Sequence, residues 1–351
     1  MFVGNDVAEA ELVAFKDIPA LTIVRSPVFS SRRARQRLAD ASLFGIDHNA
    51  ARTFQEHAVN VVFESATFYG WRFPFPTVAW LPDFQHRYFP EFFGMASYVR
   101  RELGYRAQIH FRRSIMLSSE DARADCEKFY PSSIGRTVVV RFGVHIDPAD
   151  LNVDPTQVAR EYELPERFFY LPNQFWKHKN HRLVVDALSM LKRKGHDIVV
   201  AVSGNPNDPR HPEFFQTLKQ LVVDRDVVGN FRVLGMIPRH HVLALMRACT
   251  ALINPSLCEG WSTTVEEAKA LGAPILLSDL RVHREQASEL AQFFEPTSAE
   301  QLAGLLLERQ KSLTSTYQES RTRSIELTSG RMRKYADDFV EAVDKAVVNY
   351  R

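Results

Sequence analysis

The stretch TALINPSLCEGWSTTVEEAKALGAPILLSD (residues 250–279) contains the signals of a strand, a loop, a helix and a second strand. Its two ends, TALIN and PILLSD, are short apolar runs of the kind that form buried strands. Gly260 lies in the loop, and Gly272 follows the helical segment, where glycine commonly ends a helix. We expect Thr263 to be the N-cap residue, with Glu266 completing a capping box. Such a unit is typical of a parallel sheet covered by helices.

The same alternation extends over the second half of the chain. We expect strands over 168–173, 197–204 and 231–235, and helices over 181–195, 213–224 and 240–249. In the less regular first half, we expect strands over 20–26, 60–63, 77–80, 114–119 and 137–142, and helices near 31–41, 94–105 and 120–129. The segment 143–157 is rich in Pro and Asp and lacks periodicity, so we place the linker there. The sequence therefore predicts an α/β protein with two doubly wound domains, followed by an amphipathic helix from 331.

Composition excludes several classes of protein. The chain has 44 Lys and Arg against 42 Asp and Glu, a net charge of +2, which is too balanced for a nucleic-acid partner. Three cysteines without CxxC spacing, together with the absence of a signal-peptide pattern, indicate a reducing cytoplasm. No apolar run reaches the roughly 18 residues that span a bilayer, so we expect peripheral membrane contact at most. Dinucleotide GxGxxG, P-loop and GxSxG motifs are absent, and we expect no metal site.

Two glutamates flank the start of the helix in the opening stretch. The first free N–H groups of a helix attract a phosphate. Glu267, one turn inside the helix, suits the hydroxyls of a ribose, and Glu259, in the loop, can reach hydroxyls beyond a diphosphate. This arrangement predicts a cradle for a nucleotide-sugar, and the alternative is that both are solvated surface acids.

The stretch EGWSTTVEE followed by AKALGAPILLSD resembles the E-x7-E signature of retaining glycosyltransferases of family 4 (glycosyl transferases group 1), which have the GT-B architecture. Glu259, Glu267 and Asp279 match the family pattern, whereas Trp261 and Ser262 replace its usual Phe and Gly. The similarity continues in LPNQFWKHKN (171–180), where Lys179 matches a phosphate-binding lysine. Two positions depart from the family pattern. The family has Arg where this chain has Gln174, and it has His where this chain has Pro82, in the stretch WLPDFQHRYFPEFF (80–93). The resemblance covers residues from about 60 to 330.

The resemblance implies a set of site residues. Those expected to act on the reacting groups are Glu259, Asp83 and His86. Those expected to bind the donor are Gln174, Lys177, Lys179, Ser203, Gly204, Gly260, Trp261, Ser262, Thr263, Thr264 and Glu267, with Lys177 compensating for the missing arginine. For His86, packing inside the domain is an equal alternative, and for RVHREQ (281–286) an exposed loop is favoured over a position facing the cleft.

The resemblance also implies the organisation and the reaction. Residues 1–148 would form an acceptor-side Rossmann-like domain, 149–330 a nucleotide-sugar-binding one, and 331–351 a helix that crosses back to the first domain. The reaction would be a retaining hexosyl or deoxyhexosyl transfer to a hydroxyl of a saccharide, a lipid-linked acceptor or a protein, in polysaccharide or glycoconjugate synthesis. It would need no cofactor or metal and would occur in the cytoplasm or at the inner face of the membrane. The alternatives are a catalytically weak or silent nucleotide-sugar-binding protein and, less favoured, a GT-B epimerase or phosphorylase.

The beginning of the chain departs from the family pattern. Family members have a strand, a glycine-rich turn and a long helix before a segment similar to FVGND, which here directly follows Met1. We therefore expect a chain shortened at its N-terminus, with a depleted or rearranged first sheet and weak or absent transferase activity.

Overall fold

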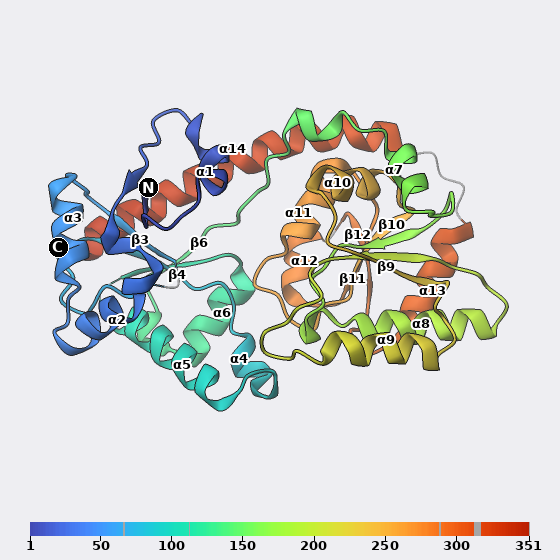
Figure 1. Ribbon diagram of the computed structural model, residues 1–351, viewed down its shortest axis with the longest axis horizontal. Coiled ribbons are helices and arrows are strands. Elements are labelled where there is room, and N and C mark those ends of the chain that lie inside the picture. The colour runs from blue at the N-terminus through green and yellow to red at the C-terminus, as the bar shows by residue number, and fades with distance from the viewer. Residues whose placement is uncertain (66, 112, 288, 312–316, 351) are drawn as a thin grey trace.

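The computed structural model describes residues 1–65, 67–111, 113–287, 289–311 and 317–350, which form two α/β domains (Figure 1). Each domain is built on a parallel sheet, so the predicted fold class is confirmed. Within the described ranges, none of the helices combines the length and apolarity that a bilayer span requires.

The first domain contains a parallel sheet in the order β3-β4-β5-β6 and, apart from it, the parallel pair β1-β2. Its strands are β1 (Phe2–Val3), β2 (Val24–Arg25), β3 (Val62–Ser65), β4 (Thr77–Trp80), β5 (Ser114–Leu117) and β6 (Thr137–Val139). Its helices are α1 (Glu9–Lys16), α2 (Ala34–Leu43), α3 (His48–Glu56), α4 (Gln85–Tyr88), α5 (Met95–His110) and α6 (Glu120–Phe129). The strand expected over 20–26 is limited to two residues, because β1, with which it pairs, is equally short. Residues 1–4 therefore do not lie in the four-stranded sheet, and the expectation of a shortened chain stays a prediction.

The second domain contains a parallel sheet in the order β12-β11-β10-β7-β8-β9. Its strands are β7 (Phe169–Leu171), β8 (Val200–Ser203), β9 (Phe231–Gly235), β10 (Ala251–Asn254), β11 (Ile275–Ser278) and β12 (Ala291–Phe294). Its helices are α7 (Pro155–Glu161), α8 (His181–Arg193), α9 (Phe214–Asp224), α10 (Arg239–Ala248), α11 (Thr263–Leu271), α12 (Arg281–Ala287) and α13 (Ala299–Lys311). The strand order reverses between β7 and β10, and ligands of open α/β sheets bind at the carboxyl ends of such a pair.

Both faces of this second sheet are buried. Phe169 and Leu171 of β7 pack with α8, α9 and α13, whereas Phe168 and Tyr170 pack on the other side with α7, α10 and α11. Burial on both faces explains why these strands are continuous apolar runs without polar alternation.

The last helix, α14 (Tyr317–Tyr350), runs along both domains (Figure 1). Tyr335, Phe339 and Val343 pack on the first sheet beside Val78 and Met116. The apolar spacing of three and four residues thus faces the first domain, in agreement with a C-terminal helix that crosses back.

Candidate active site

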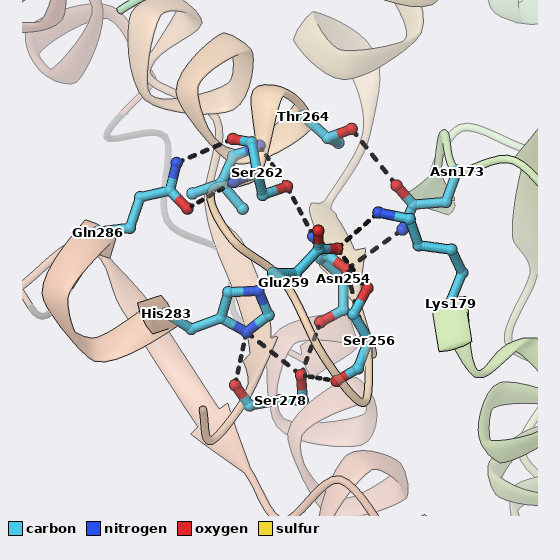
Figure 2. Close-up of polar contacts among 11 residues, drawn as sticks. Asn173, Lys179, Asn254, Ser256, Glu259, Ser262, Thr264, Ser278, His283 and Gln286 are labelled. Carbon is cyan, nitrogen blue, oxygen red and sulfur yellow. Dashed lines mark hydrogen bonds and ion pairs between the residues drawn. The ribbon is translucent and has the colours of Figure 1, made fainter. Parts of the chain in front are cut away.

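Two buried asparagines lie where the strand order reverses. Asn173 follows β7, and its Nδ2 donates to Oδ1 of Asn254, the last residue of β10 (3.2 Å). Asn254 also accepts from Ser256 Oγ (2.7 Å) and donates to Ser262 Oγ (2.9 Å), as Figure 2 shows. These bonds fix both ends of the loop that carries Glu259. Neither asparagine was predicted from the sequence, although a polar residue at the end of a buried strand is a usable signal.

Glu259 forms the central ion pair of the site. Its Oε1 accepts from Lys179 Nζ and from Ser256 Oγ, each at 2.6 Å. Burial alone would raise the pKa of this carboxyl group, but Lys179, followed by His178 and His283, outweighs it and lowers the pKa of Glu259 to about 2. The structure therefore brings together two predicted site residues that are 80 positions apart in the chain.

Lys179 lies on a short 3-10 helix, η6 (Lys177–Lys179), that ends at Asn180 in the left-handed conformation (φ 56°). The Nδ2 of Asn180 donates to the carbonyl oxygens of Pro255 and Pro296, which anchors this turn beside the Glu259 loop. Lys177 is half-buried on the same short helix. The turn therefore sets the position of the Lys179 ammonium group.

Helix α11 begins with its N-cap at Ser262, so the expected N-cap at Thr263 is wrong by one residue. Ser262 has an extended backbone, and its Oγ accepts from Val265 N. Gln286 of α12 holds Ser262 from the side, accepting from its N–H and donating to its carbonyl oxygen. Thr263 is exposed in the first turn, and Thr264 Oγ1 donates to Asn173 Oδ1 (3.4 Å). The start of α11 thus lies beside the Lys179–Glu259 pair (Figure 2).

The two glutamates of α11 have different partners. Glu266 is buried and accepts from Lys269 Nζ (2.7 Å) and Gln286 Nε2 (2.9 Å), so the expected capping box does not form. Glu267 is also buried, and its Oε1 accepts from Nη1 of Arg239 at the start of α10 (2.6 Å). Arg239 was not predicted as a site residue, because nothing near position 239 indicates a partner 28 residues away.

Other expected donor-binding residues support the walls of the site. Gln174 accepts from the N–H of Asn205 (2.6 Å) and so holds the turn after β8. Ser203 is buried against the Tyr170 hydroxyl, and Gly204 (φ 154°) has no room for a Cβ because the Asn173 carbonyl lies against it. Because each has a contact within the domain, we infer that these residues shape the site.

Trp261 reaches toward the segment that joins the domains. Its Nε1 donates to the carbonyl oxygen of Phe142 (3.0 Å), and the Lys269 ammonium lies over its ring. Trp261 thus links the Glu259 loop to the segment that follows β6.

The two predicted residues of the first domain occupy different places. Asp83 lies next to Gly260, accepts from Arg101 (2.6 Å) and caps the turn at Gln85. His86 is completely buried and contacts Glu102 (Nε2 to Oε2, 3.3 Å). Burial lowers the pKa of His86, which favours the neutral ring inside the domain. The packing alternative for His86 is the one that the structure favours.

The two domains touch around the Glu259 loop. A Cβ on Gly260 would overlap the carbonyl oxygen of Pro82, so glycine is required for this approach. Nearby, Glu285 of α12 accepts from the N–H groups of Glu120 and Asp121 at the start of α6, and also from Arg141. A carboxylate of one domain thus caps a helix of the other.

The exposed loop expected over 281–286 is wrong, because this segment is helix α12 and His283 is completely buried in it. Its Nδ1 donates to the carbonyl oxygen of Ser278 (2.8 Å), and burial lowers the pKa of the ring. Arg284 instead points outward and forms a bidentate pair with Asp279. His283 is buried because it lies on the face of α12 that meets the domain core, together with Val282, Gln286 and Ala287.

Comparison with known proteins identifies the fold. Residues 157–322, just under half of the chain, match the family model described as glycosyl transferases group 1. Alr3699/HepE from Anabaena, in complex with UDP and glucose, superposes with a TM-score of 0.70 at 15% identity, covering 98% of this chain and 91% of the other. The chain has the GT-B fold.

Two further GT-B neighbours are less similar. A glycosyltransferase from Rickettsia africae ESF-5 has a TM-score of 0.61 at 16% identity, covering 93% of this chain and 82% of the other. WaaG, a glycosyltransferase involved in lipopolysaccharide biosynthesis, has a TM-score of 0.61 at 17% identity, covering 91% and 85%. No curated protein matches the sequence significantly. The match to group 1 glycosyltransferases thus lies in the second domain, which contains the site.

Proposed function

We propose that this GT-B protein is a glycosyltransferase that moves a hexosyl or deoxyhexosyl group from a nucleotide-sugar to an acceptor hydroxyl with retention of configuration. The observation that carries the proposal is the Lys179–Glu259 pair beside the first turn of α11, with Glu267 on the same helix. A cation, free helix N–H groups and two carboxylates match a diphosphate flanked by a sugar and a ribose.

Each side chain then has a role in the proposed reaction. Lys179 and the start of α11 bind the diphosphate and stabilise the charge that develops as it leaves. Glu259 accepts from hydroxyls of the sugar and Glu267 from those of the ribose. The ion pair with Glu259 holds the Lys179 ammonium group at the start of α11, where the diphosphate would bind. Retention follows from front-face displacement, in which leaving phosphate oxygens help to deprotonate the acceptor, and neither a metal nor a cofactor is required.

The surroundings of the reaction are part of the proposal. The structures of HepE with UDP and glucose and of WaaG support a UDP-sugar as the first donor to test and polysaccharide or glycoconjugate synthesis as the setting. The acceptor would be a saccharide, a lipid-linked molecule or a protein, in the cytoplasm or at the inner face of the membrane. Asp83, which lies beside Gly260 at the domain contact, would act on the reacting groups.

The main experiment is to incubate the full chain with a panel of nucleotide-sugars and to measure slow hydrolysis of the donor. Hydrolysis of one donor, lost in Glu259→Gln, is expected of an enzyme. Binding without hydrolysis or transfer would favour the alternative of a silent nucleotide-sugar-binding protein.

A second experiment tests the ribose contact. Charge-assisted hydrogen bonds contribute about 1.5–3 kcal/mol, so Glu267→Ala should weaken binding of the nucleotide at least about ten-fold in calorimetry. Glu166→Ala, which removes an exposed carboxylate of the same domain, is the matched control. Unchanged affinity in Glu267→Ala would contradict the ribose assignment.

A further inference from the structure

Arg210, in the loop after β8, connects the two domains. Its guanidinium lies over the ring of Phe93 in the first domain, at 5.4 Å, and over the ring of Trp176 in the second, at 5.3 Å. Its Nη1 donates to Oε1 of Gln85 in α4 (3.4 Å), and its Nε donates to Oδ1 of Asp208 (3.2 Å). One cation thus brings together an amide, a carboxylate and an indole from both domains.

Three polar atoms of these side chains are buried and have no hydrogen-bond partner among the described residues: Gln85 Nε2, Trp176 Nε1 and Asp208 Oδ2. The orientation of the Gln85 amide is fixed, because only its oxygen can accept from Arg210. Gln85 and Asp208 are 4% and 2% exposed, so bulk water does not serve as the partner. Buried polar atoms are normally paired, because an unpaired one destabilises the fold. Three such atoms around one guanidinium therefore indicate a ligand site.

The chemistry of the three atoms restricts the ligand. Gln85 Nε2 and Trp176 Nε1 are donors, whereas Asp208 Oδ2 is an acceptor. A phosphate or a carboxylate could accept from the two donors but would be repelled by the Asp208 carboxylate, and a cation would be repelled by Arg210. Arg210 and Asp208 are paired with each other, so their charges already balance. Hydroxyl groups both donate and accept, so a neutral molecule with several hydroxyls can pair with all three atoms.

We propose that these four residues, Gln85, Trp176, Asp208 and Arg210, called the Arg210 cluster, bind the hydroxyl groups of a neutral sugar. Gln85 belongs to the first domain and the other three residues belong to the second. The sugar would therefore enter between the domains and form hydrogen bonds with both of them.

The Arg210 cluster lies next to the candidate active site. The ring of His178, which directly precedes Lys179, is 5.6 Å from the ring of Trp176. In the first domain, the Gln85 N–H donates to Asp83 Oδ1 (3.0 Å). The cluster is thus connected to site residues of both domains.

The position of the cluster suggests which sugar of the reaction it binds. Glu259 is already assigned to the transferred sugar, so a second carboxylate with its own donors provides for a second sugar. The ligand of the Arg210 cluster would then be a saccharide acceptor. This assignment rests on the proposed transferase function, whereas the binding of a neutral sugar does not.

The test measures binding of monosaccharides to the full chain by saturation-transfer NMR, with and without UDP. The neutral probes are glucose, galactose, mannose and N-acetylglucosamine, and glucuronate is the anionic comparison. Wild type should bind at least one neutral probe and should bind glucuronate more weakly than glucose. Calorimetry with UDP and with UDP-glucose measures the donor side separately.

Three isosteric variants each change one unpaired atom and keep the shape of the side chain. Asp208→Asn replaces the acceptor by a donor, Gln85→Glu replaces a donor by an acceptor, and Trp176→Phe removes the indole N–H. Sugar binding should weaken about ten-fold in Asp208→Asn, which loses a charge-assisted bond, and about three-fold in Trp176→Phe, which loses a neutral one. Asp224→Asn and Trp71→Phe, at exposed positions, are the matched controls and should bind the sugar as wild type does.

Unchanged circular dichroism and UDP affinity in the variants would show that only the sugar contact is lost. The proposal is overturned if no neutral probe binds, if Asp208→Asn binds the sugar as tightly as wild type, or if glucuronate binds more tightly than glucose. Weaker binding of UDP-glucose in the variants, with unchanged binding of free monosaccharides, would overturn the assignment to the acceptor. Sugar binding without any binding of a nucleotide would support the Arg210 cluster and contradict the proposed transferase function.

Discussion

Removal of the Lys179 charge should destabilise the protein by an amount that the structure sets. Lys179 and Glu259 are 2.6 Å apart, and only 14% and 9% of their side chains are exposed. A pKa lowered from 4.5 to about 2 corresponds to about 3 kcal/mol in favour of the ionised Glu259. Breaking a buried ion pair typically costs about 3–5 kcal/mol. Lys179→Met should therefore lower the free energy of unfolding by about 3–5 kcal/mol at pH 7.

The pH dependence of this loss has a definite sign. The folded pKa of Glu259 lies below the unfolded value, so its contribution is complete above pH 4.5 and is lost as the pH falls toward 2. The difference between wild type and Lys179→Met should consequently shrink over this interval. Urea denaturation at several pH values, followed by circular dichroism, measures both free energies.

A double variant distinguishes loss of the ion pair from loss of packing. In Lys179→Met with Glu259→Gln, no buried charge is left without a partner, and the amide oxygen can still accept from Ser256. We expect this variant to be more stable than Lys179→Met alone. The reasoning fails if Lys179→Met stays within about 1 kcal/mol of wild type, or if the double variant is no more stable than the single one.

Three further predictions concern acid stability and the domain contact. Burial lowers the pKa of His178 to about 4, so between pH 6.5 and 4 the unfolded chain binds a proton that the folded chain does not. The free energy of unfolding should therefore fall by about 3 kcal/mol over this interval. The fall should be shallower in His178→Asn, and an identical slope in both proteins would contradict the prediction. Gly260→Ala should separate the domains in small-angle scattering and reduce donor hydrolysis about 100-fold, whereas Gly304→Ala, where a Cβ meets nothing, should change neither. Glu285→Gln should weaken the contact with α6 and increase the radius of gyration, and Glu289→Gln, at an exposed position, is its control; equal radii in both variants would contradict the prediction.

Local sequence patterns predicted the second domain well. Strands β7 to β11 and helices α8 to α11 lie where apolar runs and helical periodicity place them, because burial on both faces of a parallel sheet makes each strand continuously apolar. Gly272 ends α11 in the left-handed conformation as expected (φ 70°). The N-cap was misplaced by one residue, since Ser262 and Thr263 are both good caps and the contacts with Asn254 and Gln286 that favour Ser262 come from distant parts of the chain.

The partners of the charged residues were decided by the tertiary structure. The sequence indicated Glu259, Glu267 and Lys179 as candidates, but Lys179 reaches Glu259 only because β7 and β10 are neighbours in the sheet. The spacing along the chain contains no information about such a pairing, nor about Arg239 beside Glu267. Likewise, the sequence did not determine whether His86 and His283 face a ligand or the core. Both are buried, because each lies on the face of its helix that meets the core. Local propensity thus determined the elements and the types of side chain available, whereas strand order and helix packing, which depend on contacts between distant residues, determined which charges are buried together.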